Sequence, residues 1–167
     1  MILIVILLQI CIKMISANDL RVLSHLRKDA RKKVTDISRD MKIPVTTIYD
    51  KIRSHKKKGI IKKHVSIIDF SKLGLYTTLF IALRTDRISK NDVEKILTNS
   101  PNINSLYKVN YGYDYLVEGV FKNLSEAHQF IEKIESLGAN QIQVYNTIET
   151  IKKEHTLTEP EHFGILD

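Results

Sequence analysis

The sequence contains little of what most enzymes and secreted proteins depend on. Cys11 is the only cysteine among 167 residues, so no disulfide can form within one chain, and a reducing compartment is favoured. The six histidines have no spacing typical of metal ligands. Neither a glycine-rich phosphate-binding loop nor a G-x-S-x-G motif occurs. We therefore expect no catalytic residues, no metal and no cofactor.

The chain also lacks an apolar run long enough to cross a membrane. Its longest apolar run, MILIVILLQICI at residues 1–12, is followed by Lys13, whereas a transmembrane helix needs about 20 apolar residues. A signal peptide is disfavoured because no Lys or Arg precedes the run. Met14 provides an alternative start, and our preferred hypothesis is that residues 1–13 reflect start-codon assignment. A translated extension packed on the protein and a membrane contact stay open as alternatives.

Positive charge is concentrated in the first half of the chain. Residues 18–64 contain 15 Lys and Arg against 5 Asp and Glu, a balance of +10. Residues 65–167 contain 10 Lys and Arg against 14 Asp and Glu, a balance of −4. A solubilising surface explains some excess of Lys, but an excess of this size over 47 residues indicates a polyanion-binding module. We expect this module to bind nucleic acid.

The basic half has the pattern of a helix-turn-helix. Apolar residues recur at helical spacing over about 18–27 and 34–41, and again after Pro44. Ser16 followed by Asp19 has the spacing of a capping box for the first helix. The turn at residues 42–44 then joins a short helix to a basic one. The expected inner face of the basic helix carries Val45, Ile48, Ile52 and His55.

The outer face of the basic helix has the chemistry of a DNA-recognition helix, because Thr, Tyr, Lys and Arg side chains can reach base edges and phosphates in a major groove. Gly59 is suited to end this helix. Ile60 and Ile61 predict a following strand, whose basic side chains and His64 would lie along the phosphates as a wing. The predicted DNA-binding residues are Thr46, Thr47, Tyr49, Asp50, Lys51, Arg53, Lys56, Lys57, Lys62 and Lys63.

The second half alternates between strand and helix patterns. Residues 77–85, 103–111, 113–121 and 140–152 read as strands, and residues 90–100 and 123–138 as amphipathic helices, the second capped by Ser125. The order βαββαβ is the ferredoxin-like pattern. Because two helices cover only one face of such a sheet, the other face should pair with a second subunit or bind something. We expect a homodimer.

With both halves in view, the chain resembles the leucine-responsive regulatory protein / AsnC (Lrp/AsnC) family of transcription regulators from archaea and bacteria. The resemblance covers residues 15–154 and rests on DLRVLSHLRKDAR, IPVTTIYDKI, KKKGIIKKHVSIIDFSKLGL, NYGYDYLVEGVF and VYNTIETIK in this order. The chain departs from the family at Pro44, where Ser is usual, at Lys51, where Arg is usual, and at His55, where Leu is usual.

The resemblance implies an α+β protein: an N-terminal winged helix-turn-helix followed by a ferredoxin-like βαββαβ ligand-binding domain. Carried onto this chain, it implies an apolar extension at 1–13, a DNA-binding domain at 14–64, a β-linker at 65–75, an effector-binding and dimerisation domain at 76–154, and a tail at 155–167. Implied partners are double-stranded DNA, further copies of the chain up to a tetramer or octamer, and an effector such as an amino acid. Implied effector-binding residues are Tyr111, Gly112, Tyr113, Asp114 and Thr147.

Two alternatives accompany this interpretation. The same architecture is similar to that of the sirohaem decarboxylases, although no cluster of His or Arg in the second half suits a polycarboxylate haem, and such an enzyme has no need of a basic first domain. A membrane-tethered regulator would depend on the apolar opening stretch. We expect a cytoplasmic regulator and no membrane partner.

Overall fold

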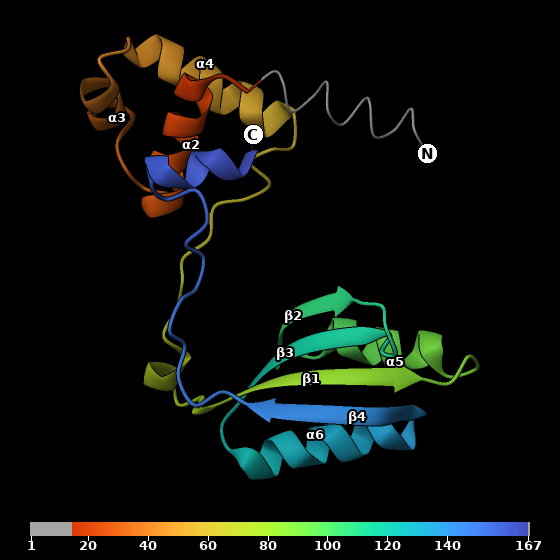
Figure 1. Cartoon of the computed structure of the whole chain (residues 1–167). Coiled ribbons are helices and arrows are strands. Elements are labelled where there is room, and N and C mark those ends of the chain that lie inside the picture. Colours follow the sequence, from red (N-terminus) through yellow and green to blue (C-terminus); the bar gives the residue numbers. More distant parts are fainter. Residues whose placement is uncertain (1–14, 167) are drawn as a thin grey trace. The chain divides into compact units, whose positions relative to one another are not determined.

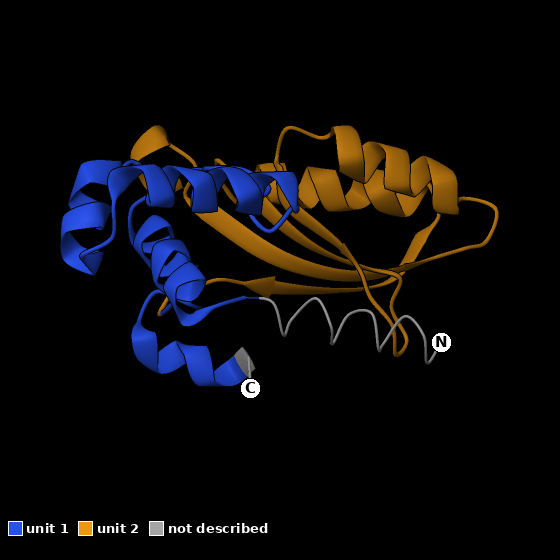
Figure 2. Ribbon diagram, turned by 90° about the horizontal axis from the view of Figure 1, so that it is seen from above, with its two compact units in different colours: residues 1–67, 152–167 blue, residues 68–151 orange. Residues whose placement is uncertain are grey.

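The computed structural model describes residues 15–166 of the chain. The chain divides into two compact units, coloured separately in Figure 2: residues 1–67 with 152–167, here called the helical unit, and residues 68–151, here called the sheet unit. Residues 1–13, which carry the start-codon and membrane hypotheses, lie outside the described residues. No helix in the described part of the chain is both long and apolar enough to cross a bilayer.

The three helices expected in the basic half are confirmed. They are α2 (Ala17–Lys28), α3 (Val34–Met41) and α4 (Val45–Lys57), labelled in Figure 1. The predicted capping box is also confirmed, since the Asp19 amide donates to Ser16 Oγ and the Ser16 amide donates to Asp19 Oδ2. The helices share a small core made by the buried side chains of Val22, Ile37, Met41 and Ile48.

The connection between α3 and α4 is a tight turn. Lys42 has a φ of 55°, in the left-handed region, and it ends α3. Ser38 closes the turn, because its hydroxyl donates to the Ile43 carbonyl at 2.6 Å and its own carbonyl accepts from the Ile43 amide. Pro44 then precedes the first residue of α4, where a missing backbone N–H costs little.

The wing and the linker differ from expectation. Residues 58–69 contain no strand, so the strand predicted from Ile60 and the β-linker predicted at 65–75 are wrong; the linker holds instead the single-turn 3-10 helix η1 (Phe70–Leu73). A strand requires a neighbour to satisfy its backbone groups, and no other strand of the described chain pairs with this segment. Alternating apolar residues such as Val65 and Ile67 are therefore exposed.

The C-terminal segment is part of the helical unit. It ends in the 3-10 helix η2 (Pro160–Leu166), drawn in blue beside α2 in Figure 1. Thr158 is buried there, and its carbonyl accepts a hydrogen bond from the Ser24 hydroxyl of α2. Residues expected to form only a tail thus contribute to the packing of the basic half.

The sheet unit has the predicted ferredoxin-like topology. Its elements are β1 (Thr77–Thr85), α5 (Lys90–Asn99), β2 (Ile103–Lys108), β3 (Tyr115–Phe121), α6 (Leu124–Ser136) and β4 (Ala139–Asn146). The antiparallel strands are ordered β2-β3-β1-β4. Leu79, Ile81 and Leu83 of β1 pack with residues of both helices, so the two helices cover one face of the sheet.

Two local predictions in this unit are wrong. Asn123 caps α6 in place of Ser125, because Asn123 Oδ1 lies where it accepts the Glu126 amide. The last strand ends at Asn146 and does not continue to 152. Its partner strand β1 begins at Thr77, so beyond the bond from the Thr147 amide to the Thr78 carbonyl there is no strand left to pair with.

Candidate functional site

The outer face of α4 presents a row of unburied polar side chains. Thr46, Tyr49, Asp50 and Arg53 occupy positions i, i+3, i+4 and i+7 of this helix, which places them on one face. All four are exposed, and the Tyr49 side chain is 59% accessible although it is a large aromatic group. Thr47 is half-buried. Such a face offers aromatic, hydroxyl, carboxylate and guanidinium groups to a partner at the same time.

Further exposed lysines follow this face along the chain. Lys56 and Lys57 are exposed in the last turn of α4, and Lys62 and Lys63 are exposed in the extended segment that follows. Between them, Gly59 has a φ of 72°, which favours glycine at the end of a helix. All four lysines are therefore available to a polyanion, although Lys62 and Lys63 are not carried by a strand.

Lys51 is placed differently from the other predicted contacts. Its Nζ donates to Asp19 Oδ1 at 2.7 Å, and its side chain is only 24% exposed. Burial raises the pKa of Asp19, but hydrogen bonds from Lys51 and Ser16 outweigh it, and the net pKa lies well below that of an ordinary carboxyl group. Lys51 thus connects α4 to α2 and is turned away from the face formed by Tyr49 and Arg53.

His55 is buried, as its place on the inner face of α4 predicts. Its side chain is 4% exposed, and Nε2 lies 3.3 Å from the same Asp19 oxygen that accepts from Lys51. Neither ring nitrogen makes a hydrogen bond within the described chain. Only the first-turn position of Asp19 could have indicated this three-residue contact from the sequence.

The turn between β2 and β3 carries four of the five predicted effector residues, Tyr111 to Asp114. Tyr111 and Gly112 have φ values of 60° and 103°, and the Tyr111 side chain is 95% exposed. The Tyr113 hydroxyl donates to Gln143 Oε1 of β4 at 2.9 Å. The turn therefore presents one free aromatic ring beside one that is held by the sheet.

Asp114 is engaged within the sheet unit. Its Oδ2 accepts from the Thr85 amide at 2.9 Å and its Oδ1 accepts from Lys90 Nζ. These bonds, from Lys90 first and from Thr85 next, lower the pKa of Asp114. The carboxylate fixes the end of β1 and the start of α5 against the turn, so it supports the position of Tyr111 and Tyr113.

Beside this carboxylate lies a contact that sequence reasoning missed. The buried Tyr115 donates its hydroxyl to Glu94 Oε2 at 2.6 Å, and Lys108 Nζ lies 2.9 Å from Glu94 Oε1. Burial first, and then the Glu94 carboxylate, raise the pKa of Tyr115. The pair ties α5 to β2 and β3 and keeps the base of the turn rigid.

Thr147 is not brought to the turn within one chain. Its amide bonds to Thr78 of β1, whereas the Asp114 amide bonds to Leu83, five positions along the same strand. At about 3.4 Å per residue these points are about 17 Å apart. The Thr147 hydroxyl is buried and makes no hydrogen bond within the described chain.

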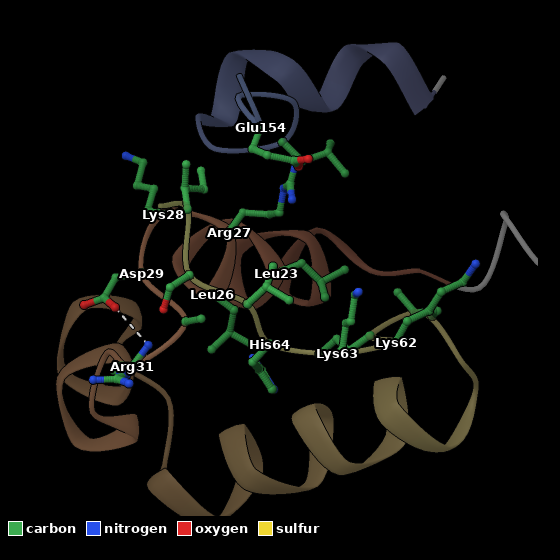
Figure 3. Close-up of a pocket in the computed structure, with 17 residues that line it drawn as sticks. Leu23, Leu26, Arg27, Lys28, Asp29, Arg31, Lys62, Lys63, His64 and Glu154 are labelled. Carbon is green, nitrogen blue, oxygen red and sulfur yellow. Dashed lines mark hydrogen bonds and ion pairs between the residues drawn. The ribbon is translucent and has the colours of Figure 1, made fainter. Parts of the chain in front are cut away.

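A cavity of about 680 Å³ lies inside the helical unit (Figure 3). Its walls come from the end of α2, from residues 60–67 and from the C-terminal segment. Figure 3 shows Arg27 and Glu154 turned toward each other, with a distance of 2.7 Å between guanidinium and carboxylate. Lys62 and Lys63 line this cavity, and none of the predicted effector residues does. The two groups of predicted site residues therefore belong to separate units.

The sequence has relatives along most of its length. Residues 78–157 match the family described as the Lrp/AsnC ligand binding domain. The HTH-type transcriptional regulator FL11 of Pyrococcus horikoshii is 27% identical over 141 residues, which are 84% of this chain and 92% of that protein. The glutamate uptake regulatory protein of Zymomonas mobilis is 24% identical over 147 residues, 86% of this chain and 90% of that protein.

Solved structures share the fold. LrpC of Bacillus subtilis superposes with a TM-score of 0.75 at 23% identity, covering 81% of this chain and 95% of that one. A transcriptional regulator of Neisseria meningitidis, solved as a complex with L-Met, has a TM-score of 0.75 at 16% identity, covering 81% and 91%. Escherichia coli AsnC has a TM-score of 0.73 at 17% identity, covering 84% and 96%.

Proposed function

We propose that this chain, which belongs to the Lrp/AsnC family of transcription regulators, binds double-stranded DNA through α4 and responds to a small-molecule effector through its sheet unit. The helix-turn-helix is formed by α3, the turn closed by Ser38, and α4. The single observation that carries the proposal is the exposed face of α4, which combines Tyr49 and Arg53 with the lysines at the end of the helix.

This chemistry suits a DNA duplex. Arg53 can donate to guanine O6 and N7 or to a phosphate, Thr46 and Tyr49 can donate to base edges or phosphates, and the lysines neutralise phosphates. Each lysine that pairs with a phosphate releases counterions and steepens the dependence of affinity on salt. A helix of this kind enters the major groove, where every base pair presents a distinct pattern of donors and acceptors.

A salt series tests the proposal. Full-length protein is titrated into labelled duplex DNA at salt concentrations between about 50 and 200 mM. Over this range, a protein that makes six to ten phosphate contacts loses about 10³- to 10⁵-fold in affinity as the salt rises. Arg53→Gln should weaken binding, whereas Lys95→Gln, an exposed lysine of α5 in the other unit, serves as the matched control. Absence of binding at low salt, or an affinity that does not depend on salt, would contradict the proposal.

The open face of the sheet supports self-association. Phe80 lies between Glu118 and Tyr145 in the sheet register, on the face opposite the two helices, and it is 37% exposed in one chain. Burying this face against a second copy would remove apolar and aromatic surface from water. We propose a homodimer as the basic assembly, with larger assemblies built from it.

The effector is proposed to be an amino acid bound near Tyr111–Asp114. The turn offers exposed backbone groups and the free Tyr111 ring, while Asp114 and Tyr113 hold it in place. Thr147 would join this site only from another subunit. A thermal-shift screen of the twenty amino acids against full-length protein tests this, because a ligand that binds only folded protein raises the unfolding temperature.

The two other functions are less well supported. The relatives named above are regulators, and the decarboxylase alternative has no comparable observation in its favour. Adding sirohaem to the protein and recording no change in absorbance would dispose of it. The membrane-tethered alternative depends on residues 1–13 alone, and cell fractionation would test it together with the proposed cytoplasmic location.

A further inference from the structure

We infer that Asp19 sets the orientation of α4 on α2, and that Lys51 is a positioning residue and not a DNA contact. The inference rests on the proposed DNA binding through α4 and says how that helix is held. Lys51 belongs to the predicted DNA-binding set, but its side chain contacts Asp19 of α2.

The two carboxylate oxygens of Asp19 serve two different helices. Oδ2 accepts from the amide and the hydroxyl of Ser16, at 3.0 and 2.7 Å, and so closes the start of α2. Oδ1 accepts from Lys51 Nζ at 2.7 Å and lies 3.3 Å from His55 Nε2, one turn further along α4. A single side chain therefore links the first turn of α2 to the middle of α4.

The side chains of this link are largely buried, so breaking it would be costly. The Asp19 side chain is 15% exposed and that of Lys51 24%, whereas His55 is 4% exposed. If Lys51 turned outward to a phosphate, it would leave a largely buried carboxylate without its strongest partner, which is costly. Lys51 is thus retained between the helices, and the DNA meets the residues on the opposite face of α4.

The core that packs these helices together with α3 is apolar and constrains direction weakly. The core of the unit is formed by Val22, Ile37, Met41 and Ile48, and apolar packing tolerates small rotations and shifts better than a directed hydrogen bond does. Asp19 fixes one point on α4 in both distance and direction. Tyr49 and Arg53 lie on another face of the same helix, so a rotation of α4 that breaks this contact would also turn them.

The slope of log affinity against log salt separates a positioning residue from a phosphate contact. Each phosphate contact contributes about 0.9 to this slope. Arg53→Gln, the matched control on the outer face, should lower the slope by about that amount if Arg53 pairs with a phosphate. We expect Lys51→Met to weaken binding about tenfold at every salt concentration and to leave the slope of the wild type unchanged.

A double-mutant cycle tests the link itself. Asp19→Asn should weaken binding about as much as Lys51→Met, and the double variant should be no weaker than either single one. Lys51→Arg, which can still donate to Asp19, should restore affinity. A reduced slope for Lys51→Met, together with full affinity for Asp19→Asn, would overturn the inference, as would additive losses in the double variant.

The same cycle, measured by urea unfolding of the full chain, separates failure of the proposed DNA binding from failure of the Asp19–Lys51 link. If wild-type protein binds no DNA, the proposed function fails, and the unfolding cycle then decides the anchor alone. Coupling between Asp19→Asn and Lys51→Met supports the anchor, and its absence refutes it. Far-ultraviolet circular dichroism of each variant establishes that the helices still form, and Lys51→Arg supplies the test should Lys51→Met fail to fold.

Discussion

The Ser24 hydroxyl donates a hydrogen bond of 2.7 Å to the carbonyl of Thr158, 134 positions later in the chain. Both residues are buried. Two ion pairs flank this bond, from Arg27 to Glu154 and from Lys28 to Glu159. The C-terminal segment is therefore fastened to α2 at three points, and the chain enters and leaves the sheet unit from the same helical unit.

We predict that Ser24→Ala destabilises the helical unit. The change leaves the buried Thr158 carbonyl without this donor, at a cost of about 1–3 kcal/mol. Hydrogen exchange of the α2 amides measures the effect locally, since the two units need not unfold together. Thr98→Ala, which removes an exposed hydroxyl of α5 in the sheet unit, is a suitable control. Unchanged exchange in α2 would show that the segment does not support the helical unit.

We predict that Asp50 contributes to the choice of DNA sequence. It is the only carboxylate in α4, it is exposed, and it has no ion-pair partner among the described residues. A carboxylate facing phosphates repels them, whereas facing a cytosine amino group it accepts a hydrogen bond. Asp50→Ala should raise affinity for random DNA and reduce discrimination at one base pair by about 1–3 kcal/mol. Selection of binding sites from a random pool, with wild type and variant in parallel, measures both, and identical preferences would contradict the prediction.

Acid should abolish the contribution of Asp19 to the free energy of unfolding. Because its pKa is lowered in the folded protein, the stabilisation is complete above the ordinary carboxyl pKa of about 3.9, declines below it, and disappears once the pH falls through the lower folded pKa. The difference in unfolding free energy between wild type and Asp19→Asn should therefore shrink as the pH falls below about 4. Urea unfolding at a series of pH values gives this difference, and a gap that stays constant down to strongly acidic pH would argue against it.

The two ends of the effector turn should respond differently to substitution. Asp114→Asn weakens the contact with Lys90 and the support of Thr85, so we expect a loss of about 1–2 kcal/mol from the sheet unit. Tyr111→Ala removes an exposed ring and should leave stability within about 0.5 kcal/mol while reducing the thermal shift caused by the effector. Thermal unfolding with and without the effector separates these outcomes. An unaltered ligand shift in Tyr111→Ala would exclude that ring from the site.

Phe80→Glu should weaken the dimer. The new carboxylate would stand beside Glu118 and Tyr145 on the open face of the sheet, where a second copy would force its burial. Sedimentation velocity over a range of concentrations should show more monomer than for wild type. Leu124→Glu, an exposed leucine at the start of α6, tests whether any added charge has this effect. Equal dissociation of both variants would locate the interface elsewhere.

Much of the fold could be predicted because its determinants are local. The capping box of Ser16 and Asp19 and the helical spacing of Ile37 and Met41 define their helices within a few residues. In the second half, period-two alternation at Leu79, Ile81 and Leu83 defines β1. The wing prediction failed because Ile60 and Ile61 have strand propensity but no strand partner in the described chain, and pairing is not a local property.

The candidate site also has features that follow from local sequence and features that do not. Residue type and helical period sufficed to place Tyr49 and Arg53 on the exposed face of α4 and His55 inside. They could not show that Lys51, which shares the chemistry of its neighbours, points toward Asp19, 32 positions earlier. Nor could they show that Asp114 is held by Lys90 and Thr85.

The sequence by itself determined the three helices of the basic half, the βαββαβ order of the second half, the concentration of positive charge in the first half, and the open face of the sheet, because these follow from periodicity and composition along the chain. Only the tertiary structure decided that the C-terminal segment joins α2 and that one carboxylate links two helices. Hydrogen bonds and ion pairs depend on distances between residues far apart in the chain, such as Ser24 and Thr158, and those distances exist only once the chain has folded.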